Sequence, residues 1–160
     1  MDKQLVKCLI ICSLILGIIL GVFSVIPYLG TFLLLIVCLF SAPLVMLYLI
    51  MDGKYDLTTV QQSIIDGAII GFFANITYCI GFSILSVLIS IAFNYTPNVI
   101  LTSMISKSPL WLFVIVIIFI GVLLATTNAF SGFLTYYIIN TIRDLYEKKN
   151  LQRKEEDING

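Results

Sequence analysis

Histidine is absent from this 160-residue chain, and charged residues are scarce. Without histidine, the chain lacks the most common metal ligand and the most common general base. Its 9 basic and 9 acidic residues give a formal net charge of +0, so no long-range field attracts nucleic acid. The sequence holds no P-loop, zinc-protease motif or dinucleotide-binding turn, and three carboxylates, Asp52, Asp56 and Asp66, are too few for a convincing metal site. We therefore expect no enzymatic activity, no cofactor, no metal and no nucleic-acid partner.

Apolar residues dominate the composition. Hydrophobic residues make up 60% of the chain and charged residues 11%, with a mean hydropathy of +1.09. Soluble domains contain about 45–50% apolar and about 25% charged residues, so this chain could not cover its own core with polar surface in water. The composition predicts an all-α polytopic membrane protein whose main partner is the lipid bilayer. The four cysteines all lie inside apolar runs and indicate no secreted disulfide framework: Cys8, Cys12, Cys38 and Cys79.

Four apolar runs are long enough to cross a bilayer. They cover approximately residues 5–26, 31–51, 64–93 and 110–140. The first run is expected to be a retained span, because its apolar core of about 18 residues is longer than that of a typical signal peptide. The short connection around Pro27 and Gly30 makes the first two runs antiparallel neighbours. The prediction is a four-transmembrane-helix antiparallel bundle within residues 1–148, followed by a frayed, solvated polar tail at 149–160.

Local signals add detail to two of these runs. Pro43 cannot donate a hydrogen bond to the carbonyl of Leu39, so the second run should bend there. Asp56 or Thr58, followed by Gln61, resembles a capping arrangement at the start of the third helix. The third run is about 30 residues long, or about 45 Å, so it must tilt, bend or protrude from a bilayer core of about 30 Å. Residues 94–109 are expected to form a loop with a short piece at the membrane surface.

A stripe of small and polar residues follows one face of the third run, and a similar stripe follows the fourth. Lipid gives no reason to collect such residues on one face, whereas close packing of two helices does. We expect these stripes to face each other. Asn75 and Asn128 should then lie in the interior, bonded to each other or to backbone near Leu39. The residues of the predicted cluster are Gly67, Gly71, Asn75, Gly121, Asn128 and Gly132.

Basic residues indicate the orientation of the bundle. Lys3, Lys7 and Lys54, with the five basic residues that follow Thr141, lie on one predicted side, and Lys107 lies on the other. Because cytoplasmic loops carry an excess of Lys and Arg, both termini should be cytoplasmic, with the chain in the plasma membrane.

Asp66 lies near the start of the third run and has two interpretations. As an acid in the first turns, it would stabilise the helix dipole. Alternatively, it could form an ion pair with Arg143 at the cytoplasmic rim of the bundle.

Two classes of function remain open from the sequence. The first is a structural, accessory or regulatory membrane protein that associates with itself or with a larger membrane partner. The second is an oligomeric permeation unit or transporter for an ion or small solute, built around Asn75 and Asn128, because polar residues inside a membrane often line pathways. A holin-like or immunity-like protein is a third hypothesis that the sequence neither supports nor excludes.

Overall fold

A computed structural model describes residues 3–26, 28–56, 59–94 and 109–159 of the chain. Within these ranges the chain forms four α-helices packed in a bundle, and each is long and apolar enough to cross a membrane. The helices are α1 (Lys3–Phe23), α2 (Leu29–Met51), α3 (Val60–Phe93) and α5 (Leu110–Asn159). The predicted all-α four-span architecture is therefore confirmed. The expected surface piece within residues 94–109, together with Lys107, lies outside the described residues.

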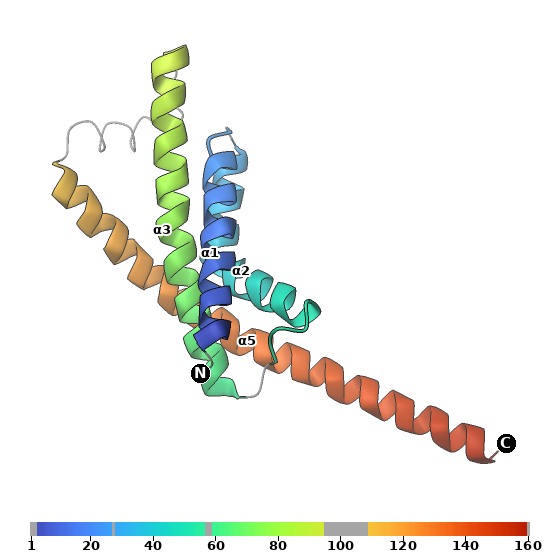
Figure 1. The fold of residues 1–160 in the computed structure, drawn as a ribbon. Coiled ribbons are helices and arrows are strands. Elements are labelled where there is room, and N and C mark those ends of the chain that lie inside the picture. The colour runs from blue at the N-terminus through green and yellow to red at the C-terminus, as the bar shows by residue number, and fades with distance from the viewer. Residues whose placement is uncertain (1–2, 27, 57–58, 95–108, 160) are drawn as a thin grey trace.

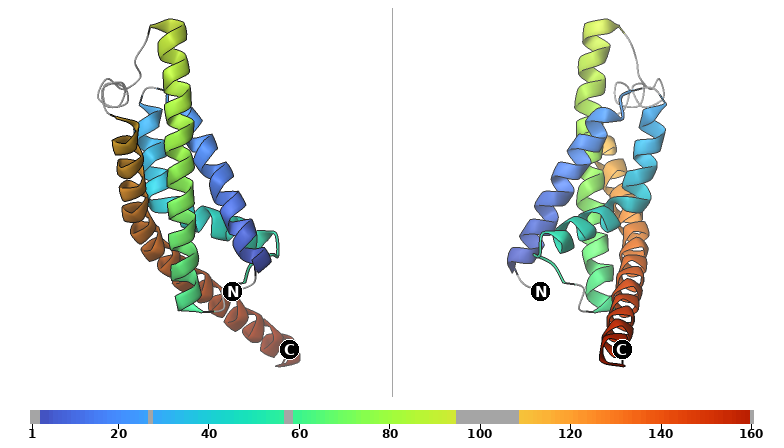
Figure 2. Two further views of the ribbon diagram at one scale, coloured as in Figure 1. Left: turned by 60° about the vertical axis from the view of Figure 1, so that its left-hand side comes forward. Right: turned by 90° about the vertical axis from the view of Figure 1, so that its right-hand side faces the viewer.

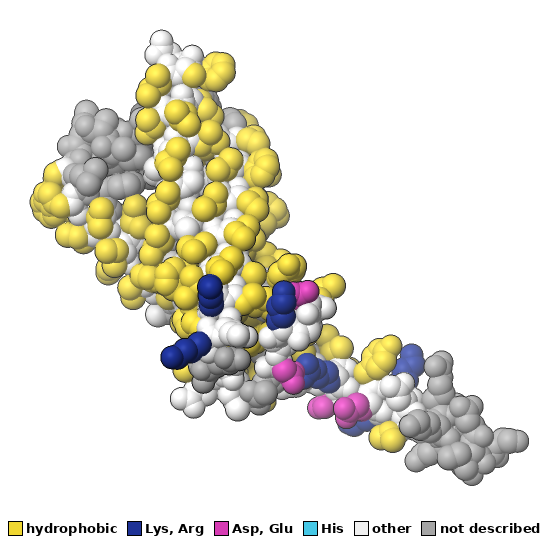
Figure 3. All heavy atoms as spheres, viewed as in Figure 1, with side chains coloured by type: hydrophobic (Ala, Val, Ile, Leu, Met, Phe, Trp, Pro, Cys, Tyr) yellow, Lys and Arg dark blue, Asp and Glu magenta, His cyan; other side chains and the backbone are white. Residues whose placement is uncertain are grey.

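Successive helices run in opposite directions through the bundle (Figure 1, Figure 2). One end of the bundle consequently holds the start of α1, the α2–α3 connection and the C-terminal half of α5. Many large apolar side chains are exposed on each of the four helices, which in water would be unfavourable. Figure 3 shows that the visible charged side chains gather at this one end and along the projecting part of α5, while apolar side chains cover the rest of that face. The chain is an integral membrane protein whose outer surface suits lipid.

Helix α3 is the central helix, and it packs between α1 and α5. Glycines permit both contacts, because they let the backbones approach closely. A Cβ atom at Gly17 would collide with the backbone of Ala74, and one at Gly132 would lie 2.5 Å from the carbonyl oxygen of Ser63. The two small faces of α3 and α5 therefore meet, as the stripe pattern predicts.

Helix α2, which contains Pro43, changes direction part-way along its length, and its second half runs sideways across the bundle (Figure 1, Figure 2). This second half supplies most of the apolar core at the charged end. Met46 and Leu49 are fully buried there and pack with Leu9 from α1 and Ile70 from α3. The bend thus turns a lipid-crossing helix into a layer that closes one end of the bundle.

The helix boundaries differ most from the sequence prediction at the start of α3 and at the end of α5. Helix α3 begins at Val60 and its N-cap is Thr59, whose side chain accepts a hydrogen bond from the Gln62 backbone N–H at 3.3 Å. The prediction of Asp56 or Thr58 as the cap is wrong, because Thr59 is the residue placed three positions before a free helical N–H. Helix α5 continues through Asn159, so residues 149–159 are helical and not frayed. Its segment from Thr141 to Leu151 is exposed and leaves the bundle.

Candidate functional site

The most extensively bonded polar side chain in the bundle is Asn128, at the crossing of α2 and α5. It is fully buried. Its Nδ2 donates to the carbonyl oxygens of Val37 at 3.2 Å and Cys38 at 3.0 Å. Its Oδ1 accepts from Ser41 Oγ at 2.8 Å and from the backbone N–H of Ala42 at 3.0 Å. One side chain on α5 thereby bonds both donors and acceptors of α2.

Pro43 explains why α2 offers these backbone groups. A proline inside a helix removes one hydrogen bond and pushes the preceding turn open, so nearby carbonyl and N–H groups need other partners. Asn128 supplies partners for the turn from Val37 to Ala42, and Ser131 Oγ donates to the carbonyl of Leu39. The bend and the α2–α5 contact are therefore one structural unit, which we call the Pro43–Asn128 crossing.

Glycines on α3 make room for this crossing. A Cβ atom at Gly71 would lie 2.5 Å from the Cβ atom of Asn128, and one at Gly67 would collide with the Asn128 carbonyl oxygen. Close by, Ser63 Oγ donates to the carbonyl oxygen of Gly132 at 2.7 Å. Three of the predicted glycines, Gly67, Gly71 and Gly132, thus contact the α3–α5 interface directly.

Asn75 lies in the interior, 3% exposed, but it does not bond to Asn128. It lies one helical turn beyond Gly71, opposite Gly121, where a Cβ atom would be 3.5 Å from Asn75 Nδ2. Its Oδ1 accepts from Cys79 Sγ at 3.9 Å. Among the described residues, neither Asn75 Nδ2 nor the buried Ser86 Oγ has a hydrogen-bond partner. The two predicted asparagines therefore occupy different levels and different bonding environments.

The structure gives Asp66 and Arg143 different partners from the expected rim pair. Asp66 is fully buried and accepts a hydrogen bond from the hydroxyl of Tyr55 at 2.7 Å. Arg143 donates to Asp56 Oδ1 at 2.8 Å, and both side chains are exposed. The connection between α2 and α3 folds back on the bundle, so Tyr55 contacts Asp66 and Asp56 contacts Arg143. Two contacts consequently attach this connection, one to α3 and one to α5.

Tyr55 lies outside the helices, and its hydroxyl is a donor at this buried position. Burial raises the pKa of Tyr55 above its ordinary value, and the neighbouring carboxyl of Asp66 raises the pKa further. The hydroxyl therefore stays protonated over the physiological range and keeps its hydrogen bond.

Sequence analysis missed two of these contributors. Ser41 carries no sequence signal for a contact with another helix. Its Oγ lies 3.0 Å from the Val37 carbonyl oxygen of its own helix and 2.8 Å from Asn128 Oδ1, so its one hydroxyl hydrogen is shared between the two acceptors. Tyr55 carries no sequence signal for its contact with Asp66, because an aromatic residue in a polar connection ordinarily marks the membrane interface.

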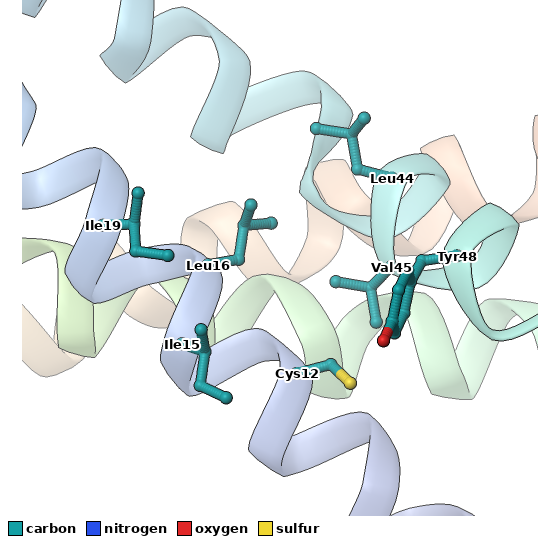
Figure 4. A pocket seen from close by; sticks show the side chains of 7 residues that line it. All are labelled: Cys12, Ile15, Leu16, Ile19, Leu44, Val45 and Tyr48. Carbon is teal, nitrogen blue, oxygen red and sulfur yellow. The ribbon is translucent and has the colours of Figure 1, made fainter. Parts of the chain in front are cut away.

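Apolar grooves mark the outside of the bundle. One lies between α1 and the second half of α2, with a volume of about 360 Å³. Its lining side chains are drawn in Figure 4. Another, of about 350 Å³, lies between α3 and α5 and is lined by small and aromatic residues, including Ala68, Phe72, Ala125 and Ala129. Within the described residues, no group of three or more Cys, Asp or Glu side chains could hold a metal ion.

No family model, curated protein or solved structure matches this chain.

Proposed function

We propose that the chain is a non-catalytic integral membrane protein with a structural, accessory or regulatory role, acting through association with itself or with a larger membrane partner. The main support for this proposal is the hydrogen bonding of the Asn128 side chain. All of its polar atoms are bonded within the bundle, four of these bonds reaching α2, so none remains to meet a solute.

The groove between α3 and α5 supports association with another membrane helix. Ala125 and Ala129 are spaced four apart on α5 and border this groove together with Ala68 of α3. Small residues with this spacing allow a second helix backbone to approach closely, and such contacts drive helix association in lipid.

Replacing Asn128 by leucine tests the proposal. We expect Asn128→Leu to weaken helix packing in detergent and to leave solute flux in liposomes unchanged from that of empty vesicles. Thr141→Leu is the matched control, because Thr141 is exposed on the same helix and does not line the groove between α3 and α5. Measurable ion or solute flux through the wild-type protein that Asn128→Leu abolishes would contradict the proposal.

A second candidate function is an oligomeric permeation unit, and one observation favours it. Asn75 Nδ2 and Ser86 Oγ are buried and have no hydrogen-bond partner in the part of the chain that the structure describes. They lie three turns apart on the same face of α3. Buried polar groups of this kind bind water in many proteins. If this stripe lines a pathway, wild-type liposomes should show flux that Asn75→Leu removes and Asn128→Leu leaves in place.

We further infer that both termini face the cytoplasm. The support is the shared end of the bundle that carries Lys3, Lys7, Lys54 and Arg143. In a cysteine-free background, Gly53→Cys and Asn150→Cys should resist an impermeant maleimide in intact cells and react after permeabilisation. Labelling of either residue in intact cells would contradict this orientation.

A further inference from the structure

The groove between α1 and α2 is an open, apolar trough near the charged end of the bundle. Ile15 and Ile19 line it from α1, and Leu44 and Val45 line it from α2. In Figure 4, the Cys12 thiol and the Tyr48 hydroxyl lie toward each other at one end of this trough. Its volume of about 360 Å³ falls within the range of about 300–1,000 Å³ that is typical of small-molecule sites.

The bend in α2 creates this trough. All of its lining residues on α2 follow Pro43, where the helix turns from its first direction and crosses α1 at an angle. Two helices that cross at an angle cannot close the space between them with side chains along their whole length. The open side faces outward, because Ile15, Leu44 and Tyr48 are all exposed. In a bilayer this side would meet acyl chains.

One pair of opposite charges lies near the Cys12 end of the trough. Lys54 Nζ contacts Asp52 Oδ2 at 2.5 Å, and the two side chains are 60% and 41% exposed. The backbone N–H of Asp52 donates to the carbonyl oxygen of Tyr48 at 3.0 Å, so the pair lies one helical turn from a residue that lines the trough. The pair therefore sits where an apolar groove meets the polar surface.

Both partners of this pair have unused bonding capacity. An ammonium group has three donors and a carboxylate has about four acceptor positions, so one mutual contact leaves most of them available. Lys54 can thus donate to a phosphate while Asp52 accepts from an ammonium group. A headgroup that carries both charges matches this pair better than a headgroup with a negative charge alone.

We propose that this groove binds one phospholipid with an amine-bearing zwitterionic headgroup, of the phosphatidylethanolamine type, with an acyl chain along Ile15, Ile19 and Leu44, its phosphate at Lys54 and its ammonium at Asp52. A choline headgroup has the same net charge but no N–H donor, so it cannot donate to Asp52. A phosphatidylglycerol headgroup supplies the phosphate but no cation. The lipid site does not depend on the proposed structural role, since a permeation unit could hold the same lipid.

Native mass spectrometry of the full chain tests this site. The purified protein is delipidated in detergent and exposed to equal amounts of phosphatidylethanolamine, phosphatidylcholine and phosphatidylglycerol. We expect one tightly retained lipid per chain, with phosphatidylethanolamine favoured by about tenfold, the effect of one charge-assisted hydrogen bond. Equal retention of the three headgroups would overturn the proposal.

Matched variants locate the bound lipid. Leu44→Trp fills the trough, and Leu47→Trp is its control, because Leu44 and Leu47 are 44% and 43% exposed on the same helix and only Leu44 lines the trough. We expect Leu44→Trp to lower lipid retention by at least about tenfold and Leu47→Trp to leave it unchanged. Equal retention by the two variants would overturn the site.

Charge variants test the headgroup contacts separately. Lys54→Gln should weaken retention of phosphatidylethanolamine by about tenfold, whereas Lys7→Gln should not change it. Asp52→Ala removes the acceptor of the ammonium group and should remove the preference for ethanolamine over choline. Retention of that preference in Asp52→Ala, or a protein dimer that Leu44→Trp dissociates, would show that the groove has another occupant and would overturn the proposal.

Discussion

Replacing Asn128 by leucine should be among the most destabilising conservative changes in the membrane-spanning part of the chain. The substitution removes four hydrogen bonds to α2, to Ser41, Ala42, Val37 and Cys38. Interhelical hydrogen bonds in membrane proteins are worth about 0.6 kcal/mol on average, so the four together contribute about 2 to 3 kcal/mol. The expected loss is of the same size as the cost of leaving one buried backbone N–H without a partner, about 1–3 kcal/mol.

The measurement is reversible unfolding in mixed micelles, followed by circular dichroism. Asn75→Leu is the internal comparison, because Asn75 is also buried, at 3% exposed, but among the described residues its side chain bonds only Cys79, at 3.9 Å. We expect its free energy of unfolding to change by less than about 1 kcal/mol. Equal losses of unfolding free energy in the two variants would refute the stabilising role of the Asn128 hydrogen bonds. The cost would then depend on the burial of an asparagine and not on its hydrogen bonds.

A double-mutant cycle with Pro43 sharpens this test. In Pro43→Leu, α2 can restore its own hydrogen bonds and the turn no longer needs Asn128. The Asn128→Leu change should therefore cost at least about 1 kcal/mol less in that background than in the wild type, since residues that share one network are non-additive. Simple additivity would show that the bend and the asparagine act independently.

Three further changes test other contacts. Gly71→Val should block the close approach of α3 and α5 and destabilise the bundle by about 1–3 kcal/mol, measured by the same unfolding assay. Tyr55→Phe leaves the buried Asp66 without its hydroxyl donor and should cost about 1–3 kcal/mol. Because the folded-state pKa of Tyr55 is raised, the stabilisation from its protonated hydroxyl is complete below the unfolded pKa of about 10 and is lost as the pH rises further. The wild type should therefore lose stability at alkaline pH, and Tyr55→Phe should reduce this loss. Arg143→Gln removes only the exposed pair with Asp56 and should change stability by less than about 1 kcal/mol, so a larger loss would contradict the structure.

The spans and their packing faces could be predicted because bilayer physics is restrictive. A run of about 20 apolar residues has few alternatives to a transmembrane helix, and glycines on one helical face have few explanations other than a close neighbour. The pattern around Gly67, Gly71 and Gly132 therefore identified the contact between α3 and α5 without any homologue. The bend at Pro43 followed from the missing donor.

Partner choice could not be predicted in the same way. The stripes placed Asn75 and Asn128 in the interior and left two partners open, each other or backbone near Leu39. Asn128 bonds the carbonyls of Val37 and Cys38, next to Leu39, whereas Asn75 bonds neither, because the residue that reaches the open turn depends on how α2 bends. The alternative interpretation, an ion pair between Asp66 and Arg143, rested on both residues lying near one end of the bundle. The contacts instead depend on the path of the α2–α3 connection, which brings Tyr55 to one residue and Asp56 to the other. Loop paths follow from tertiary packing, and no periodicity encodes them.

The bend of α2 connects the stability of the bundle to its proposed lipid site. Proline at position 43 opens one turn, and Asn128 from α5 bonds the groups that the turn exposes. The second half of α2 then crosses α1, burying Met46 and Leu49 on one side and opening the groove beside Leu44 on the other. A straight α2 would bury less at this end and would leave no trough of the same shape. Pro43→Leu should therefore lower lipid retention as strongly as Leu44→Trp does, although Pro43 does not line the groove, and full retention in Pro43→Leu would separate the groove from the bend.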